Sequence, residues 1–258
     1  MNILFIGDIV GRAGRRSVRL FLDKIKKEYE VDFVISNGEN SAGGFGITKK
    51  VAEELYGYGI DFFTMGNHTW DNKDIFKFID EESRLIRPLN FPKQNPGRGW
   101  QTIELNSKKI TIVNLIGQVY MQGNDSPYHK FMDLYPEIKD SDIILVDFHA
   151  EATGEKMAFA RAVDGMVTAV IGTHTHVQTN DAQIFPEGTA YITDAGLTGA
   201  VDSILGMKPD KMVEKMKTSL PVRYEVGTGE VKIEAVLINI NDNNNKATDI
   251  MVIKKNNL

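Results

Sequence analysis

Five short segments of this chain carry side chains that bind metal ions through oxygen or nitrogen. Each contains an Asp, Glu, Asn or His, and each follows a run of apolar residues. The segments are Gly7-Asp8, Asn37-Gly38-Glu39-Asn40, Gly66-Asn67-His68, Phe148-His149-Ala150 and Gly172-Thr173-His174-Thr175-His176. The chain has no cysteine, so a metal would be held by oxygen and imidazole nitrogen, a ligand set that admits iron, manganese or zinc. Four of the five histidines lie in these segments, and this clustering predicts a metal centre.

The apolar runs that precede the segments predict the strands that would position them. They cover residues 2–6, 32–36, 61–65, 143–147 and 169–171. Helical patterns near 15–28, 48–56 and 72–81 separate the first three runs, and this alternation is typical of parallel strands. In open α/β sheets, ligands bind outside the carboxyl ends of the strands. We therefore expect the five segments to meet in one crevice.

A centre with two metals would give these residues distinct roles. Two divalent metals about 3.5 to 4 Å apart need a bridging carboxylate and a few terminal ligands each. Glu39 is the candidate bridge, because Asp8 can then serve one metal alone. The other expected ligands are Asn67, His149, His174 and His176. On a continuing strand the last two would point to the same face, and Asn40 is either a further ligand or a cap of the next turn.

Four more residues have a chemical interpretation beside a structural one. His68 is expected to face the crevice without being a ligand, where a general acid would protonate a departing oxygen. Asp71 either orients His68 or caps a helix over 72–81. Arg12 either holds a substrate phosphate near Asp8 or is a solvated cation at a helix start. His129 is interpreted as a surface histidine in a loop, with substrate contact as the alternative.

Composition narrows the class of protein. The 258 residues are 42% hydrophobic and 25% charged, which is ordinary for a globular chain, and we expect one domain over 1–258. The formal net charge of -5 argues against a protein that coats nucleic acid. No run approaches the roughly 18 apolar residues of a membrane span, and the N-terminus lacks the features of a signal peptide. A cytoplasmic protein without a membrane partner is expected.

The later part of the chain predicts further elements. Residues 101–105 and 109–116 have strand patterns that could form a hairpin, and 132–139 and 152–164 have helical patterns. The tail alternates polar and apolar residues over 222–226 and 231–235 around a Gly-Thr-Gly turn, which predicts a second hairpin. Residues 249–253 are expected to close its sheet after a polar turn over 241–245.

The metal-binding segments together resemble the calcineurin-like metallophosphoesterases. That family has an Asp block, an acidic bridge block, Gly-Asn-His, a later His and a final His-x-His block, in this order. The resemblance implies an α/β fold, a four-layer α/β/β/α sandwich of two mixed sheets. Three positions depart from the pattern: Val10 replaces a His, Glu39 replaces an Asp, and Thr173 replaces the residue before the last block. The missing first His strengthens the case for Asn40 as a ligand.

The variant pattern is similar to the bacterial YmdB-like branch. The matching motifs are Gly38-Glu39-Asn40, Gly66-Asn67-His68-Thr69-Trp70-Asp71 and Thr193-Asp194-Ala195-Gly196-Leu197-Thr198-Gly199. The resemblance implies a phosphodiesterase with two divalent or mixed-valence metal ions, iron first and manganese or zinc as alternatives. Its substrate would be a small phosphodiester such as a 2',3'-cyclic nucleotide, opened by a metal-bridging hydroxide, and homo-oligomers would be expected.

The same resemblance implies how the ligands divide. One metal would be held by Asp8, Glu39, Asn40 and His176, and the other by Glu39, Asn67, His149 and His174. His68 would be the proton donor. Two other functions stay open: a broad phosphomonoesterase that uses the same site, and a non-catalytic regulator that binds a nucleotide or a partner protein.

Overall fold

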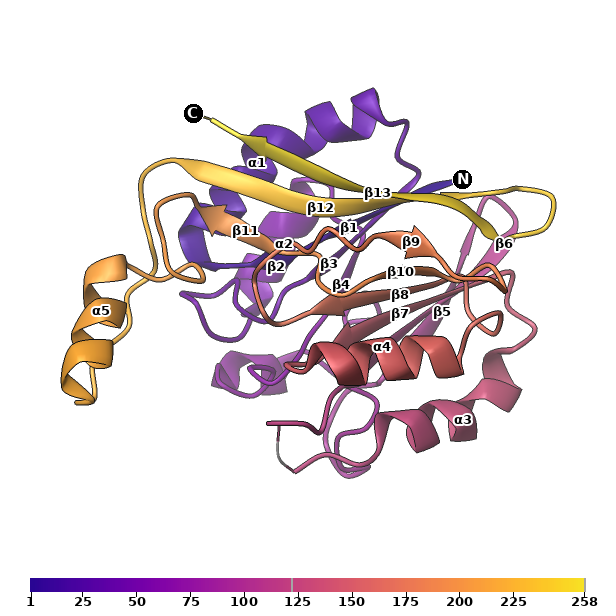
Figure 1. Ribbon diagram of the computed structural model, residues 1–258, viewed down its shortest axis with the longest axis horizontal. Coiled ribbons are helices and arrows are strands. Elements are labelled where there is room, and N and C mark those ends of the chain that lie inside the picture. Colours follow the sequence, from indigo (N-terminus) through magenta and orange to yellow (C-terminus); the bar gives the residue numbers. More distant parts are fainter. Residues whose placement is uncertain (122, 258) are drawn as a thin grey trace.

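Two β-sheets pack face to face, and helices cover their outer faces (Figure 1). The structure is a computed structural model that describes residues 1–121 and 123–257. Three large clusters of buried apolar residues fill the space between the sheets and the two spaces between sheet and helices. The predicted four-layer α/β/β/α sandwich of two mixed sheets is confirmed.

The first sheet contains both the first and the last strands of the chain, in the order β2-β11-β12-β1-β3-β4 with β13 beside β12. Its strands are β1 (Asn2–Ile6), β2 (Asp8–Ile9), β3 (Phe33–Asn37), β4 (Phe62–Thr64), β11 (Leu197–Ala200), β12 (Val231–Ile240) and β13 (Ala247–Asn256). β1, β3 and β4 are parallel, as predicted, whereas β12 runs antiparallel to β1. Strands from the two ends of the chain therefore share this sheet, and the single domain over 1–258 stays a prediction.

The second sheet has the order β5-β6-β7-β8-β10-β9. Its strands are β5 (Trp100–Leu105), β6 (Lys108–Ile116), β7 (Ile143–His149), β8 (Ala169–Thr173), β9 (Gln183–Ile184) and β10 (Ala190–Ile192). The four central strands β6, β7, β8 and β10 are parallel, and the two edge strands are antiparallel to their neighbours. β7 and β8 therefore end on the same edge of the sheet.

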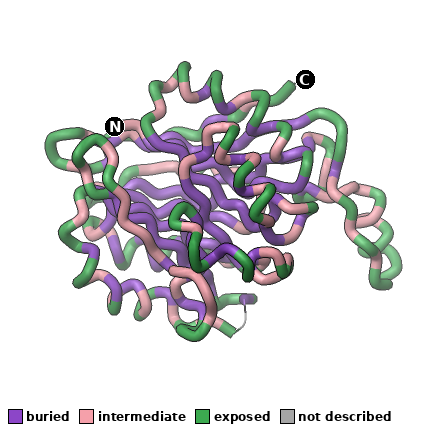
Figure 2. Tube along the Cα trace, turned by 180° about the vertical axis from the view of Figure 1, so that it is seen from behind, coloured by how far each residue is buried: buried purple, intermediate pink, exposed green. Residues whose placement is uncertain are grey.

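The strands that lead to the site are buried on both faces, which explains their continuous apolar runs. In β1, Ile3 and Phe5 pack between the two sheets, whereas Leu4 and Ile6 pack against the helices. Figure 2 shows this buried interior as purple strands inside a green and pink periphery.

Four helices cover the sheets. α1 (Gly11–Glu28) and α2 (Lys49–Gly57) lie on the first sheet, and α3 (Pro127–Ile138) and α4 (Thr153–Ala162) lie on the second (Figure 1). α1 buries Val18, Leu22 and Ile25, which the 3.6-residue period places on one face. A fifth helix, α5 (Pro209–Thr218), projects from the body and has no buried residue. None of the helices in the described ranges is both long and apolar enough to cross a bilayer.

The side chain of Glu234, which lies in β12, links this strand to its neighbour β11. This side chain is 1% exposed. Its Oε2 accepts a hydrogen bond from the Leu197 amide at 2.9 Å, and its Oε1 lies 2.7 Å from both Lys232 Nζ and Lys254 Nζ. Burial by itself would raise the pKa of Glu234, but these partners lower it below its usual value. The buried carboxylate is therefore held ionised.

Several secondary-structure predictions were wrong. The helix expected over 72–81 is only a short 3-10 helix at Lys73–Lys77, capped by Asn72. Residues 222–226 form no strand except for one isolated bridge at Val226; they lead back from α5 along the surface, where alternating exposure imitates a strand. The C-terminal hairpin is β12–β13, with the predicted polar turn between its strands. His129 lies in α3 rather than in a loop, but it is exposed as expected.

Candidate metal centre

The carboxyl ends of strands from both sheets meet at one place. Asp8 is in β2, Glu39 and Asn67 follow β3 and β4, and His149 is the last residue of β7. His174 follows directly after β8. Two sheets that pack face to face thus bring together ligands that lie up to 168 positions apart in the sequence, counting from Asp8 to His176.

Glu39, His149 and His174 form the densest group of ligand atoms. One ligand atom from each lies within 4.8 Å of the other two. His149 Nε2 is 3.1 Å from Glu39 Oε1 and 3.1 Å from His174 Nδ1, and it is 2.9 Å from Asn67 Oδ1. These four residues are the set that the family resemblance implies for one metal.

Asp8, Asn40 and His176 form a second group next to the first. His176 Nε2 lies 3.1 Å from Asn40 Nδ2 and 3.7 Å from Asp8 Oδ1. Asp8 also accepts a hydrogen bond from the His174 amide at 3.2 Å, which ties the two groups together. Asn40 therefore contacts the imidazole that also approaches Asp8.

The polar atoms at the centre fit metal ions. Asp8 and Glu39 are 0% and 1% exposed, yet Asp8 Oδ1 and Glu39 Oε1 accept no hydrogen bond from any residue in the described ranges. Buried oxygens of this kind nearly always have a partner. Glu39 Oε1 is close to His149 Nε2, but not in hydrogen-bonding geometry. Carboxylate, amide and imidazole donors are the ligands that iron, manganese and zinc accept.

The pKa values of the carboxylates and imidazoles at the centre show where a metal would compete with protons. Burial would raise the pKa of Asp8, but the positive charge of the neighbouring His176 holds it well below its usual range. In return Asp8 overcomes the effect of burial on His176 and raises its pKa to about 9. Glu39 likewise raises the pKa of the buried His149. Since imidazole binds metal in its neutral form, a metal bound at His176 would release a proton at pH 7.

His174 behaves differently. Burial, together with the charge of the neighbouring His149, lowers its pKa to about 3. The ring is therefore neutral near pH 7, and a nitrogen lone pair is available without loss of a proton. Glu151 Oε2 lies 3.1 Å from His174 Nε2, at the exposed side of the ring.

The backbone after β8 is bent sharply. The strand ends at Thr173, so His174 and His176 do not lie on a continuing strand, the condition under which both were expected to point to the same face. Both histidines have positive φ, 99° and 62°, a conformation that costs a non-glycine residue of order 1–3 kcal/mol. The bend nevertheless brings both rings to the site. Close packing also explains Gly66, where a Cβ would lie 2.3 Å from the His149 ring.

A buried hydrogen-bond chain orients His149. Thr173 Oγ1 donates to Asp147 Oδ1 at 2.7 Å and lies 2.9 Å from His149 Nδ1. Since the hydroxyl proton goes to Asp147, Nδ1 must carry the proton and donate to the hydroxyl oxygen. Asn37 uses its amide protons on Asp147 Oδ2 and Met65 O. His149 Nε2 is therefore left with its lone pair facing Glu39.

A second buried chain supports the bend after β8. Lys156 Nζ, which is 0% exposed, lies 2.9 Å from Asp194 Oδ2 and donates to Thr173 O at 2.7 Å. The same Asp194 oxygen accepts from Thr175 N and Thr175 Oγ1. This ion pair fixes the loop that carries both histidines.

Sequence reasoning missed these supporting residues. Asp147 carries a signal that could have found it, because a carboxylate two positions before His149 interrupts an apolar strand. Lys156 carries no comparable signal, since a lysine in a helix ordinarily faces solvent.

His68 and Asp71 lie as expected if Asp71 orients the His68 ring. His68 Nδ1 lies 2.7 Å from Asp71 Oδ2, and the Phe45 ring contacts the imidazole edge-on at 5.0 Å. The His68 amide donates to Glu39 Oε2 at 2.8 Å, so His68 is fixed to the candidate bridge. The alternative role for Asp71 was wrong, because Asn72 supplies the helix cap.

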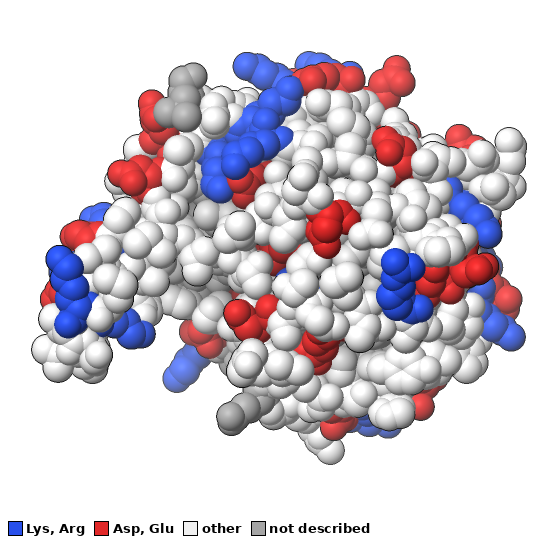
Figure 3. Space-filling model, in the orientation of Figure 1, with Lys and Arg blue, Asp and Glu red and all other residues white. Residues whose placement is uncertain are grey.

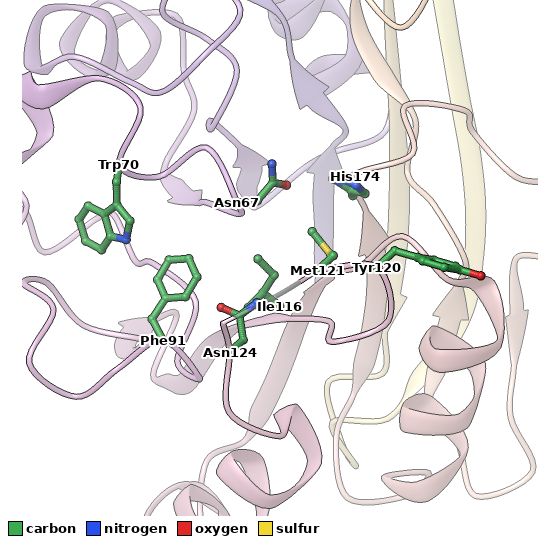
Figure 4. Close-up of a pocket in the computed structure, with 8 residues that line it drawn as sticks. All are labelled: Asn67, Trp70, Phe91, Ile116, Tyr120, Met121, Asn124 and His174. Carbon is green, nitrogen blue, oxygen red and sulfur yellow. The ribbon is translucent and has the colours of Figure 1, made fainter.

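A cavity of about 370 Å³ opens beside the centre, and Asn67 and His174 line it (Figure 4). Arg12 lies elsewhere, in a hollow with Arg16 and Arg19 on α1 that contains none of the expected ligands.

Comparison with known proteins agrees with this geometry. Residues 4–253 match the family model described as YmdB-like protein. The chain belongs to the YmdB-like family. It is 47% identical, over 97% of its length and 95% of the relative's, to the 2',3'-cyclic-nucleotide 2'-phosphodiesterase of Bacillus subtilis (strain 168).

Solved structures with the same fold include two from other bacteria. A Mycoplasma pneumoniae protein described as a novel phosphatase superposes with a TM-score of 0.95 and 35% identity, covering 99% of this chain and 93% of that one. A putative 5'-nucleotidase from Staphylococcus aureus superposes with a TM-score of 0.63 and 15% identity, over 98% of this chain and 54% of that one. The second likeness shows a shared fold alone.

Proposed function

We propose that this YmdB-like protein is a metal-dependent phosphodiesterase that hydrolyses small phosphodiesters, with 2',3'-cyclic nucleotides as the substrate class. The observation that carries the proposal is the pair of buried, unpartnered oxygens of Asp8 and Glu39 among three imidazoles. The name of the Bacillus subtilis relative supports the substrate class. Acidic and basic side chains are interspersed on the face shown in Figure 3, and the net charge is -5, which suits a small substrate better than a nucleic-acid backbone.

The ligands divide into two overlapping sets in this proposal. Asp8, Glu39, Asn40 and His176 hold one metal ion, and Glu39, Asn67, His149 and His174 hold the other. Iron is our first choice, with manganese or zinc as alternatives. Two such ions, when bound, activate water and neutralise charge on the phosphoryl oxygens.

His68 supplies the proton for the leaving oxygen. In this role the protonated His68 ring donates a hydrogen bond from Nδ1 to Asp71 Oδ2, 2.7 Å away. The proton on Nε2 is transferred to the ribose oxygen that departs when the cyclic ester opens. Asp71 holds the ring in place and stabilises the cation. Because His68 contacts Glu39 only through its backbone amide, its side chain is not needed for metal binding.

The test combines elemental analysis with turnover. Protein purified without chelator should contain about two metals per chain and should hydrolyse 2',3'-cyclic AMP. His68→Ala should lose turnover and keep its metal, whereas Glu39→Ala should lose both. His129→Ala is the matched control, since His129 is exposed on α3. Loss of metal in His68→Ala would contradict the assigned role.

The phosphomonoesterase alternative differs in substrate only. An aryl monoester and an aryl diester assayed beside the cyclic nucleotide separate the two. Protein that stays inactive after iron or manganese is restored would instead support the non-catalytic regulator. The homo-oligomer stays a prediction, which light scattering of the purified protein would test.

A further inference from the structure

The cavity beside the metal centre has walls suited to a flat aromatic ring. Besides the two candidate ligands, it is lined by Trp70, Phe91, Ile116, Tyr120, Met121 and Asn124. In Figure 4, Trp70 and Phe91 lie on one side of the cavity and Tyr120 on the opposite side, with Ile116, Met121 and Asn124 between them. The lining is therefore mostly apolar and aromatic, with one amide.

We propose that this cavity binds the nucleobase of the substrate. The inference rests on the proposed function and extends it, because it names the residues that would distinguish a nucleotide from a plain cyclic phosphodiester. Asn67 and His174 belong both to the cavity wall and to the candidate ligand set. A base in the cavity would therefore lie next to the metal that Asn67 and His174 would hold.

The aromatic wall is held rigidly. The Trp70 ring stacks on Phe76 with an interplanar angle of 11° and a centroid distance of 5.3 Å, and its centroid is 5.9 Å from that of Phe91. Phe91, Ile116 and Met121 form a small buried cluster that contacts Trp70. A preformed apolar wall of this kind binds a flat ring without first having to be ordered.

The other features suit a base rather than a simple alkyl group. Asn124 Nδ2 donates one hydrogen bond to Gly117 O at 3.3 Å. Its second N–H and its Oδ1 are not used by residues in the described ranges, so they can pair with the edge of a base, as asparagine does with adenine. Tyr120 is 87% exposed; its ring points away from Trp70 and Phe91 in Figure 4 and would have to turn toward the cavity to cover the outer face of a base. Stacking of this kind is a main source of affinity for unpaired bases.

The first experiment compares two cyclic phosphodiesters with the metal-loaded protein: 2',3'-cyclic AMP, and glycerol 1,2-cyclic phosphate, which has the same strained ester and no base. Trp70→Leu and Tyr120→Ala should each lower kcat/KM for the nucleotide roughly tenfold through KM, with glycerol cyclic phosphate changed less than roughly twofold. The matched control is Trp100→Leu, because Trp100 is the other tryptophan of the chain, packs against the buried apolar cluster of the second sheet and does not line the cavity. Since Tyr120 is exposed and lies on another segment, its variant tests the proposal even if Trp70→Leu folds poorly.

The second experiment measures binding without turnover. Adenosine should bind to the metal-loaded protein in calorimetry, ribose should not, and Trp70→Leu should weaken adenosine binding. If neither cyclic ester is hydrolysed but adenosine binds in this way, the proposed function fails and the base site stands. Equal loss on both cyclic esters, no loss on either, or adenosine binding no better than ribose would overturn the base site.

Discussion

Thr173→Val is the sharpest test of how the fold prepares the metal centre. The substitution keeps the shape of the side chain and removes the hydroxyl that joins Asp147 Oδ1 at 2.7 Å to His149 Nδ1 at 2.9 Å. All three residues are at most 1% exposed, so water cannot easily replace the lost partner. The His149 ring then has no fixed tautomer or orientation.

The expected size follows from these contacts. Loss of a group that orients a metal-binding histidine typically lowers metal affinity about 10- to 100-fold. Each buried polar group left without a partner costs about 1–3 kcal/mol of stability. Asp147 keeps one partner, because Asn37 still donates to its Oδ2 at 3.1 Å. The loss of stability caused by the unpaired Asp147 oxygen should therefore lie at the lower end of this range. The metal effect should therefore exceed what the loss of stability explains.

Competition with a chelator measures metal affinity, and thermal unfolding of the metal-free protein measures stability. Thr111→Val is the matched control: Thr111 is also buried, and its hydroxyl joins Thr102 Oγ1 at 2.6 Å to Ser141 Oγ at 2.7 Å, away from the site. Both variants should unfold at lower temperature, but only Thr173→Val should release metal more easily. Equal metal affinity in the two variants would refute the reasoning.

Three other substitutions have defined outcomes. Asp71→Asn should lower kcat at least about tenfold at unchanged metal content, because His68 loses its anionic partner. Lys156→Met should cost about 3–5 kcal/mol in the free energy of unfolding, because Asp194 is left as an uncompensated buried charge. Glu234→Gln should cost about 1–3 kcal/mol at pH 7. Since the folded-state pKa of Glu234 lies below 4.5, its contribution is present above pH 4.5 and is lost as the pH falls through the folded-state pKa, so the cost should shrink in acid.

Exposed counterparts serve as controls for these three variants. Lys130→Met removes an exposed partner of Asp125, 3.1 Å away, and should cost less than about 1 kcal/mol. Glu104→Gln changes an exposed glutamate on β5 and should not alter the pH profile of unfolding. A Lys156→Met variant as stable as Lys130→Met would contradict the role of the buried ion pair. A metal content that falls with kcat in Asp71→Asn would contradict an effect through His68 alone.

Local sequence was enough to predict the strands that carry the site. Apolar runs buried on both faces are continuous, as β1, β3 and β7 show, and a ligand type directly after each run marks the end of the strand. Surface segments were less predictable. Residues 222–226 alternate like a strand but have no partner strand, and α5 has an amphipathic pattern without a buried face. In both segments, the local pattern of polar and apolar residues does not indicate what the segment packs against.

The sequence alone therefore determined the strand ends and the residue types at the centre, because periodicity and strand ends are local features. The resemblance of its motifs to a known family implied the four-layer fold. Only the tertiary structure decided which groups are partners. Asp147 and Thr173 lie on neighbouring strands, and Lys156 reaches Asp194 from a helix 38 positions away in sequence. The aromatic cavity likewise combines Trp70, Phe91 and Tyr120 from separate loops. Such contacts depend on sheet order and packing, which bring together residues that no spacing rule connects.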